Sequence, residues 1–337
     1  MSSRNAPASN EHAPALGLAH RILGRVHVTG VFWYRFAYWG FTRLPSWTDW
    51  FSVPIAAAFF FLVLKNIRDA LAANLEPVMG PTGRWGRLRR SWLTIWEFAW
   101  CFAERYRRIS DPHLFHAVLE GEEHWRAISE SPTGAIVVTA HIGPWETAAQ
   151  FGATASNRRI HVVREKEMDQ RAQDFVREIL TRAGPNYIAH FSGDDPTLSF
   201  ELADALRRGD IVALQCDRPR AGGRTVVASL FGRPMPLPIG PAALARATGA
   251  PIVPIFNFRD GRFKTRVVAR KPFHVARTAD RSADIAEAVH YLASQIEAAI
   301  RERPHQWFCF RRLWSEGSSS NARRRVESAR SKIPSGI

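Results

Sequence analysis

A histidine and a glutamate five positions apart, His141 and Glu146, are the residues of this chain whose types and spacing most directly suggest chemistry. They follow the apolar run 135–138, whose β-branched residues are typical of a buried strand. Gly143 permits a sharp turn, and Pro144 suits the first position of a helix. We therefore expect the imidazole at the carboxyl end of a strand, beside a carboxylate on the following helix. A histidine oriented by a carboxylate is suited to act as a general base.

The alternative is that His141 is a structural residue whose ring caps nearby backbone groups. Its predicted position favours a functional role, because open α/β sheets bind ligands at the carboxyl ends of their strands. The N-terminus of the next helix would also stabilise an anion there. The pair is therefore a candidate catalytic site rather than an isolated motif.

Two further polar clusters follow predicted strands. Arg164 comes after the strand at 159–163, where its guanidinium can bind a phosphate or carboxylate with two parallel hydrogen bonds. The alternative for this arginine is a surface ion pair with a nearby glutamate. Asp217 and Arg218 come after the strand at 211–216. All three side chains are expected at the same edge of the sheet as the histidine.

The elements that must position these residues alternate between strands and helices from about residue 115 to residue 314. This alternation predicts an α/β fold with a mixed, largely parallel sheet flanked by helices. Strands are predicted at 135–140, 159–163, 186–190, 211–216, 226–230, 252–258 and 264–269, and helices at 144–155, 168–183, 197–208, 240–248 and 283–302. A longer helix with a basic start and a tryptophan-rich continuation is predicted at 84–110.

Composition narrows the classes of partner. The 337 residues include 46 Lys and Arg against 31 Asp and Glu, a net charge of +15, which favours an anionic partner: nucleic acid, a phospholipid surface or an acidic carrier protein. The sequence contains no recognised nucleic-acid-binding module, so no nucleic acid partner is expected. The three cysteines lie far apart without CxxC spacing, which argues against a zinc site or a disulfide framework and favours a reducing compartment.

The N-terminal part is apolar and aromatic. The longest uncharged run, from Trp50 to Leu64, is shorter than the ~20 residues that span a bilayer. Aromatic residues mixed with arginines precede it, a combination that the membrane interface favours. We expect membrane attachment, either monotopic or through one short hydrophobic helix; the alternative is a buried amphipathic helix pair. The expected division is a disordered 1–15, a membrane-associating helical region at 16–110, an α/β domain at 111–315 and a disordered basic tail at 316–337.

Several motifs in a fixed order resemble the bacterial lipid A biosynthesis (lauroyl/myristoyl) acyltransferase family, within the glycerolipid acyltransferase superfamily. The resemblance covers roughly residues 50–314. It is carried by His141-x-Gly143-x-Trp145-Glu146, the strand into Asp217, Phe231-Gly232-Arg233-Pro234 with Gly240-Pro241-Ala242, Gln306-Trp307 with Phe310-Arg311-Arg312, and the stretch from Lys65-Asn66 to Asn74-Leu75.

The resemblance implies a membrane-associated O-acyltransferase at the cytoplasmic face of a bacterial inner membrane. Its donor would be an acyl carrier protein or acyl-CoA thioester, its acceptor a lipid hydroxyl, and it would need no further cofactor and no metal. His141 would be the general base and Glu146 the residue that orients it. The acceptor or donor pocket would include Arg164, Asp217, Arg218 and Gly143.

The chain departs from the family's common pattern at Pro144 and in the segment 165–167, which leaves the acceptor open. A lipid A precursor or a lysophospholipid is expected first. An amino-acid-linked lipid, a glycolipid or a polyene remains an alternative acceptor. The competing classes of function are non-catalytic: a nucleic-acid binder or a basic lipid-binding protein.

Overall fold

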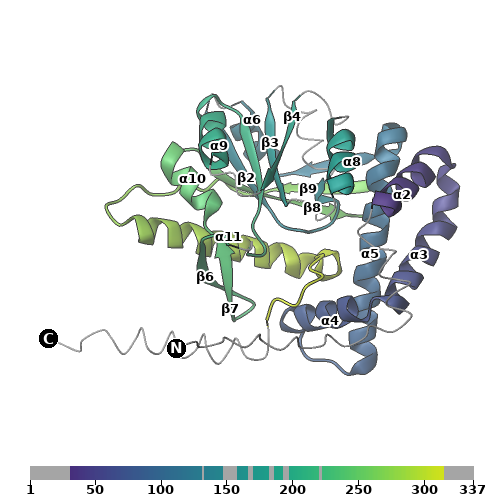
Figure 1. The fold of residues 1–337 in the computed structure, drawn as a ribbon. Coiled ribbons are helices and arrows are strands. Elements are labelled where there is room, and N and C mark those ends of the chain that lie inside the picture. Colours follow the sequence, from purple (N-terminus) through teal and green to yellow (C-terminus); the bar gives the residue numbers. More distant parts are fainter. Residues whose placement is uncertain are drawn as a thin grey trace, which may run out of the picture.

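A seven-stranded, mostly parallel sheet forms the centre of the structure (Figure 1). The computed structural model describes residues 31–130, 133–146, 158–165, 170–181, 186–192, 197–219 and 222–314. The strands of the sheet are β1 (His116–Glu120), β2 (Ala135–Thr139), β3 (Ile160–Glu165), β4 (Tyr187–Ser192), β5 (Ile211–Gln215), β8 (Ile252–Arg259) and β9 (Lys264–Ala269), in the spatial order β1-β9-β8-β2-β5-β3-β4. Two more strands, β6 (Thr225–Leu230) and β7 (Arg233–Pro238), form a separate antiparallel hairpin.

Five neighbouring strands, β8, β2, β5, β3 and β4, run parallel to one another. Only the β8–β9 pairing within this sheet is antiparallel. Parallel strands are covered on both faces, and the first seven residues of β8 are accordingly all buried. The predicted α/β class with a largely parallel sheet is therefore confirmed.

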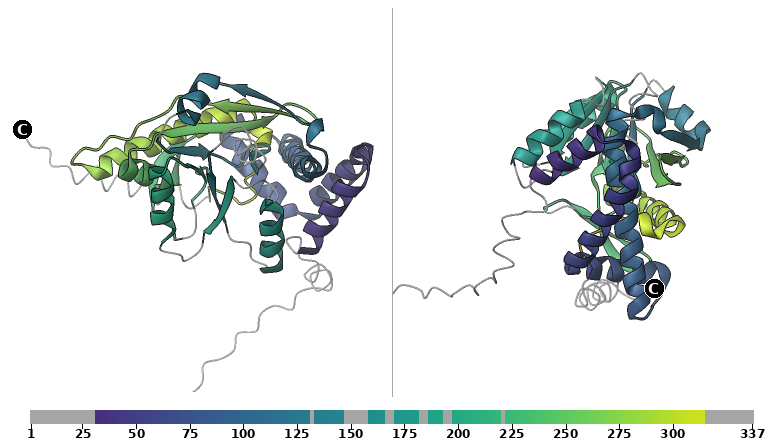
Figure 2. Two further views of the ribbon diagram at one scale, coloured as in Figure 1. Left: turned by 90° about the horizontal axis from the view of Figure 1, so that it is seen from above. Right: turned by 90° about the vertical axis from the view of Figure 1, so that its right-hand side faces the viewer.

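Helices cover the two faces of this sheet (Figure 2). They are α6 (Glu122–Ser129), α8 (Gln170–Thr181), α9 (Leu198–Arg207), α10 (Gly240–Thr248) and α11 (Arg281–Glu302). Successive residues of a strand face opposite sides, so Ile136 and Val138 pack with α9, α10 and α11, whereas Ala135 packs with Ile128 of α6. The carboxyl ends of the central strands stay available for a binding site.

Among the described residues, four helices stand beside the sheet, at the right of Figure 1. They are α2 (Val31–Arg43), α3 (Asp49–Val63), α4 (Lys65–Met79) and the 27-residue α5 (Arg84–Ser110). The side chain of Val53 on α3 packs against Trp100 and Ala103 of α5. Within the described residues, Ser46–Val63 is long and apolar enough to cross a membrane by length and composition, and 17% of it is buried in the protein.

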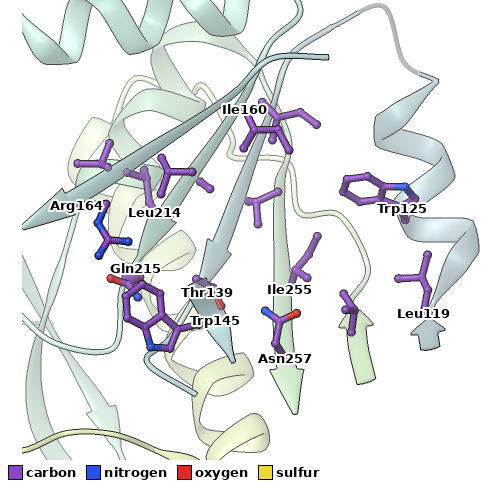
Figure 3. Close-up of a pocket in the computed structure, with 16 residues that line it drawn as sticks. Leu119, Trp125, Thr139, Trp145, Ile160, Arg164, Leu214, Gln215, Ile255 and Asn257 are labelled. Carbon is purple, nitrogen blue, oxygen red and sulfur yellow. The ribbon is translucent and has the colours of Figure 1, made fainter. Parts of the chain in front are cut away.

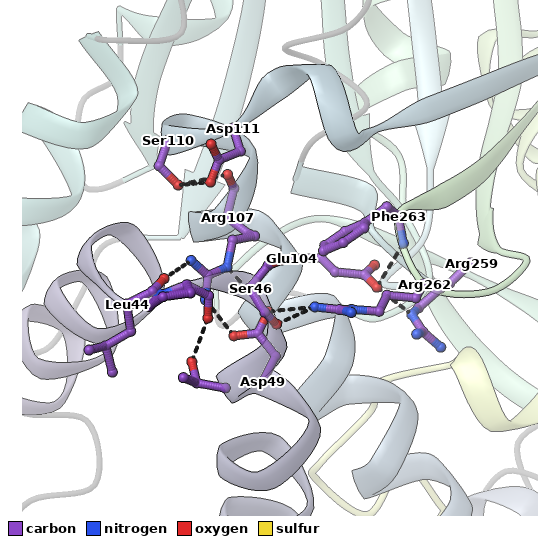
Figure 4. A network of polar contacts seen from close by, with 12 residues as sticks. Leu44, Ser46, Asp49, Glu104, Arg107, Ser110, Asp111, Arg259, Arg262 and Phe263 are labelled. Carbon is purple, nitrogen blue, oxygen red and sulfur yellow. Dashed lines mark hydrogen bonds and ion pairs between the residues drawn. The ribbon is translucent and has the colours of Figure 1, made fainter.

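A buried ion pair fixes the start of α3 (Figure 4). Arg107 of α5 donates to both carboxylate oxygens of Asp49, at 2.6 and 3.2 Å, and both residues are almost completely buried. Arg262, just before β9, approaches the same carboxylate at 3.3 Å. These contacts join α3, α5 and the edge of the α/β part.

Three elements of the described α/β part were not predicted from the sequence: β1, α6 and β7. β7 contains three prolines at alternate positions, which conceal a strand because proline cannot donate to a ladder. In a two-stranded hairpin the nitrogen atoms of these prolines can face away from the partner strand, so the hydrogen bonds between β6 and β7 can still form. The helix predicted at 144–155, and the segments 1–15 and 316–337, lie wholly or mostly outside the described residues.

Candidate active site

A groove of about 540 Å³ lies at the carboxyl ends of β2, β3 and β5. Five of the six residues singled out in the sequence line it: His141, Gly143, Glu146, Arg164 and Arg218. The sixth, Asp217, is fully buried directly behind the histidine. The expectation that the ends of separate strands bring these residues together therefore matches the described geometry.

Asp217 makes the contact that orients the histidine. Its Oδ1 lies 2.7 Å from His141 Nδ1, and its Oδ2 accepts a hydrogen bond of 3.0 Å from the indole of Trp307. Burial would raise the pKa of Asp217, but the contacts with His141, Arg218 and Trp307 outweigh burial and lower the pKa below the usual range. The ionised carboxylate only accepts, so Nδ1 carries the proton and Nε2 keeps its lone pair.

Glu146 has a different position from the one expected. Its carboxylate contacts Arg105 of α5 and accepts a 2.7 Å hydrogen bond from Arg164. Burial would raise the pKa of Glu146, yet the two guanidiniums lower it from 4.5 to about 2. The prediction that Glu146 orients His141 is corrected here: two arginines bind this carboxylate, and the buried Asp217 takes the orienting position. Arg164, expected to bind an anion, is held by Glu146.

Arg218 lies on the other side of the imidazole. Its Nη2 donates to His141 Nε2 at 2.8 Å and lies 3.9 Å from Glu165 Oε2. A guanidinium has donors only, which agrees with a neutral imidazole that accepts at Nε2. A hydroxyl that gives its proton to Nε2 has to displace this contact.

The last residue of η3 (Pro304–Gln306) and the segment that follows it hold the histidine loop in place. The N–H of Gly143 donates to Gln306 O at 2.9 Å, and the N–H of Phe308 donates to His141 O at 2.8 Å. Gly143 has a φ of 53°, and a Cβ atom there would lie 2.3 Å from Asn257 O. The glycine is required by this conformation and close approach. The N–H of Gly143 donates to Gln306 within the protein. Gly143 therefore lines the groove because the chain turns there.

The groove has an aromatic wall. The ring of Phe98 on α5 contacts Phe308 and Phe310, with centroid distances of 5.3 and 4.8 Å. A smaller cavity of about 110 Å³ adjoins the groove on one face of the sheet, and Trp145 and Arg164 border both (Figure 3). Its other labelled residues are mostly apolar, such as Ile160, Leu214 and Ile255. The site therefore combines a polar centre with apolar walls.

Two contributors were missed at the sequence level. Arg105 lies in the middle of a long helix without any motif, so only the fold brings it to Glu146. Trp307 belongs to one of the ordered motifs, but nothing in the sequence indicates that its indole donates to Asp217. A buried tryptophan usually needs an acceptor for its indole N–H. This general need is the only signal in the sequence that Trp307 has a polar partner.

A family model described as bacterial lipid A biosynthesis acyltransferase matches residues 25–316. The chain belongs to this family. The resemblance inferred from the ordered motifs is confirmed. The chain is also 27% identical, over 216 residues, to the phosphatidylinositol mannoside acyltransferases of two Mycobacterium tuberculosis strains, H37Rv and CDC 1551. The alignment covers 63% of this chain and 64% of the length of each relative.

Proposed function

We propose that this protein transfers a fatty acyl chain from a thioester donor to a hydroxyl group of a lipid acceptor. The observation that carries the proposal is the His141–Asp217 pair, with its 2.7 Å contact, at the wall of a groove. Membership in the acyltransferase family supports the same reaction class. A buried carboxylate that fixes the tautomer of a histidine is the arrangement that general-base catalysis requires.

In the proposed reaction the acceptor oxygen attacks the thioester carbonyl carbon while its proton passes to His141 Nε2. Asp217 stabilises the imidazolium that forms, because its ionised carboxylate lies against Nδ1. The tetrahedral intermediate then expels the sulfur as the C–S bond breaks. The proton on Nε2 passes to the leaving thiolate, so the products are an ester and a thiol, and the histidine is neutral again.

Arg218 is proposed to move aside when the acceptor binds. Its guanidinium leaves Nε2 for the Glu165 carboxylate, 3.9 Å away, or for the developing negative charge on the carbonyl oxygen. A guanidinium placed at developing charge stabilises the transition state. The aromatic wall of Phe98, Phe308 and Phe310 supplies the apolar surface for an acyl chain.

We propose acyl-CoA or acyl carrier protein as the donor and a glycolipid as the first acceptor to test. The glycolipid is favoured by the names of the two mycobacterial relatives. A lipid A precursor, a lysophospholipid, an amino-acid-linked lipid or a polyene is the alternative. Attachment to the cytoplasmic face of the inner membrane is proposed from the exposed aromatic residues of α2 and α3, such as Trp39, Trp50 and Phe51.

Replacement of the proposed base tests the assignment. His141→Ala is expected to lower the rate of acyl transfer by about 10²–10⁴-fold, because general-base catalysis contributes this much. Transfer is measured with radiolabelled acyl-CoA and acyl carrier protein donors on lipid acceptors in mixed micelles, and circular dichroism checks that the variant folds. Wild-type turnover by a folded His141→Ala protein would exclude the histidine as base.

The natural acceptor is identified by comparing lipid extracts of cells with and without the gene by mass spectrometry. The expected result is one lipid class that lacks a single acyl chain when the gene is deleted. An unchanged lipid profile, together with lipid binding by the purified protein, would favour the non-catalytic lipid-binding function instead.

A further inference from the structure

A second groove, of about 570 Å³, adjoins the candidate active site and contains three arginines. Arg87 comes from α5, while Arg311 and Arg312 come from the segment after η3. All three residues are exposed. The rest of the lining is Asn66, Ile67, Asp69 and Ala70 of α4, together with Phe310. We call this set of residues the arginine groove.

The arginine groove carries an excess of positive charge. Its one carboxylate, Asp69, is already paired with Lys65 at 2.8 Å, and that hydrogen bond is the main reason why the pKa of Asp69 is lowered. Arg311 donates one hydrogen bond to the carbonyl of Pro219. Several guanidiniums around one space suit an anion with multiple acceptor oxygens, such as a phosphate.

A buried asparagine fixes the segment that carries two of these arginines. Asn74 of α4 is 1% exposed, and its amide donates to the carbonyls of Cys309 and Arg311 at 3.0 and 2.8 Å. The N–H of Leu313 donates to the Asn74 side-chain oxygen at 3.0 Å. Three hydrogen bonds from one buried side chain hold residues 309–313 against α4. The arginine groove therefore has a preorganised backbone.

The arginine groove and the candidate active site share a wall. Phe310 lines both cavities. The same short segment contacts the catalytic pair, because Trp307 donates to Asp217 and the N–H of Phe308 donates to the carbonyl of His141. A ligand that occupies the arginine groove is thus one aromatic side chain away from the groove that contains the proposed base.

The distance between the arginine groove and His141 is compatible with the length of the phosphopantetheine arm that acyl carriers have in common. From Phe308 to Arg312 the chain takes four steps, which span at most about 14 Å. The phosphopantetheine arm has about 13 bonds between phosphorus and sulfur, slightly more than four extended residues, or ~15 Å. A phosphate in the arginine groove can therefore place its sulfur beside His141.

We infer that the arginine groove binds the phosphate of the phosphopantetheine arm of the donor, with Arg87 and Arg312 as its principal contacts. The arm then runs past Phe310 into the candidate active site. The inference rests on the proposed function, since it assumes an acyl thioester donor. It assigns the acyl chain and the acceptor to the first groove and the carrier to the second.

The test compares two donors that differ only in this phosphate, acyl-phosphopantetheine and acyl-pantetheine. The wild-type protein is expected to have a KM about 10–100-fold lower for the phosphorylated donor, because charge-assisted hydrogen bonds to the phosphate are lost otherwise. In the double variant Arg87→Gln/Arg312→Gln this preference is expected to fall below about threefold. Equal preference in the variant and the wild type would overturn the inference, as would a rise in the KM of the acceptor alone.

Arg84→Gln is the matched control. Arg84 lies on the same helix and is exposed, but it does not line the arginine groove. This variant is expected to keep the wild-type preference between the two donors. An equal loss in the control would mean that general positive charge on α5, rather than the groove, attracts the donor, and would overturn the inference.

Acyl-CoA and acyl carrier protein both contain this phosphate, so the double variant is expected to raise the KM for both. The ratio of kcat/KM for the two donors, measured with the wild type, then identifies the natural donor. A rise for acyl-CoA alone would place the arginines at its nucleotide, and a rise for the carrier protein alone would place them at its acidic surface. Either result would overturn the phosphate assignment.

Binding of phosphopantetheine itself, measured by calorimetry, separates this inference from the proposed function. It requires no acyl group and no turnover. Binding that the double variant weakens, in a protein without transferase activity, would support the groove and refute the reaction. Active transfer without any such binding dependence would refute the groove and leave the reaction standing.

Discussion

Glu146 lies near His141 in the sequence, whereas Asp217 lies next to its imidazole in space. The surroundings of these two carboxylates give them different roles. Asp217 contacts His141 Nδ1 and is shielded from solvent by Trp307. Glu146 contacts two guanidiniums. A carboxylate that fixes the tautomer affects the chemical step, whereas a carboxylate between arginines chiefly affects the local fold.

Asp217→Asn is expected to lower kcat by about 10²–10⁴-fold with little change in the KM of either substrate. The amide can donate to Nδ1, which favours the wrong imidazole tautomer. Steady-state kinetics over a range of pH, with far-UV circular dichroism as a check on folding, measure this effect. If the variant kept wild-type kcat, Asp217 would not be the orienting residue.

Glu146→Gln is expected to lower stability in a pH-dependent way. The folded-state pKa of about 2 lies below the ordinary 4.5, so ionised Glu146 stabilises the folded state above pH 4.5, and this contribution is lost as the pH falls from 4.5 towards 2. The difference corresponds to about 3 kcal/mol at neutral pH. Urea unfolding of both proteins at several pH values measures it. A stability difference that stays constant down to pH 2 would contradict this role.

The strand that leads into His141, the glycine turn, and the arginine and aspartate at the ends of neighbouring strands were all predictable, because strand periodicity and parallel topology place them. The residue that orients His141 was not predictable. Residue spacing suggested Glu146, but the pairing depends on Arg105 and Trp307, which reach the site from α5 and from the C-terminal segment. Contacts between residues so distant in sequence leave no local pattern.

At the scale of elements, strands rich in β-branched residues were found correctly and the proline-rich β7 was missed. Its partner β6 was predicted, but three prolines contradict the ordinary signal for a strand. β1 alternates between exposed and half-buried residues, and so lacks the strong apolar run of the central strands. Edge position explains both failures, because an edge strand needs little burial to form.

The attachment of α3 depends on the buried Asp49–Arg107 pair. Asp49→Ala is expected to destabilise the protein by about 3–5 kcal/mol, since it leaves a buried guanidinium without a carboxylate to balance its charge. The neighbouring Arg262 loses the same carboxylate. Chemical denaturation measures the change, and Lys65→Ala, which removes an exposed ion pair, serves as the control with a loss below about 1 kcal/mol. Equal losses in the two variants would contradict the importance of the buried pair.

At the scale of the whole molecule, the exposed aromatic and aliphatic residues gather on the N-terminal helices. On α3 these include Phe51 and Ile55, which are 63% and 69% exposed. The opposite side of α3 packs on α4 and α5 through Val53 and Ala57. A helix packed along one side in this way presents its other side to a partner, so the proposed membrane contact is side-on rather than spanning.

The double variant Phe51→Glu/Ile55→Glu is expected to weaken binding to vesicles of anionic phospholipid by more than about 100-fold, because insertion of each apolar side chain contributes about 2 kcal/mol. Phe200→Glu is the control: Phe200 is 73% exposed, but it belongs to α9 on the α/β part. Vesicle sedimentation measures binding, and transfer to a short-chain, water-soluble acceptor is expected to be similar in all three proteins because these side chains do not line the groove. Equal vesicle binding by the double variant and the wild type would exclude this face as the membrane contact. Weakening by Phe200→Glu alone would place the contact on the α/β part instead.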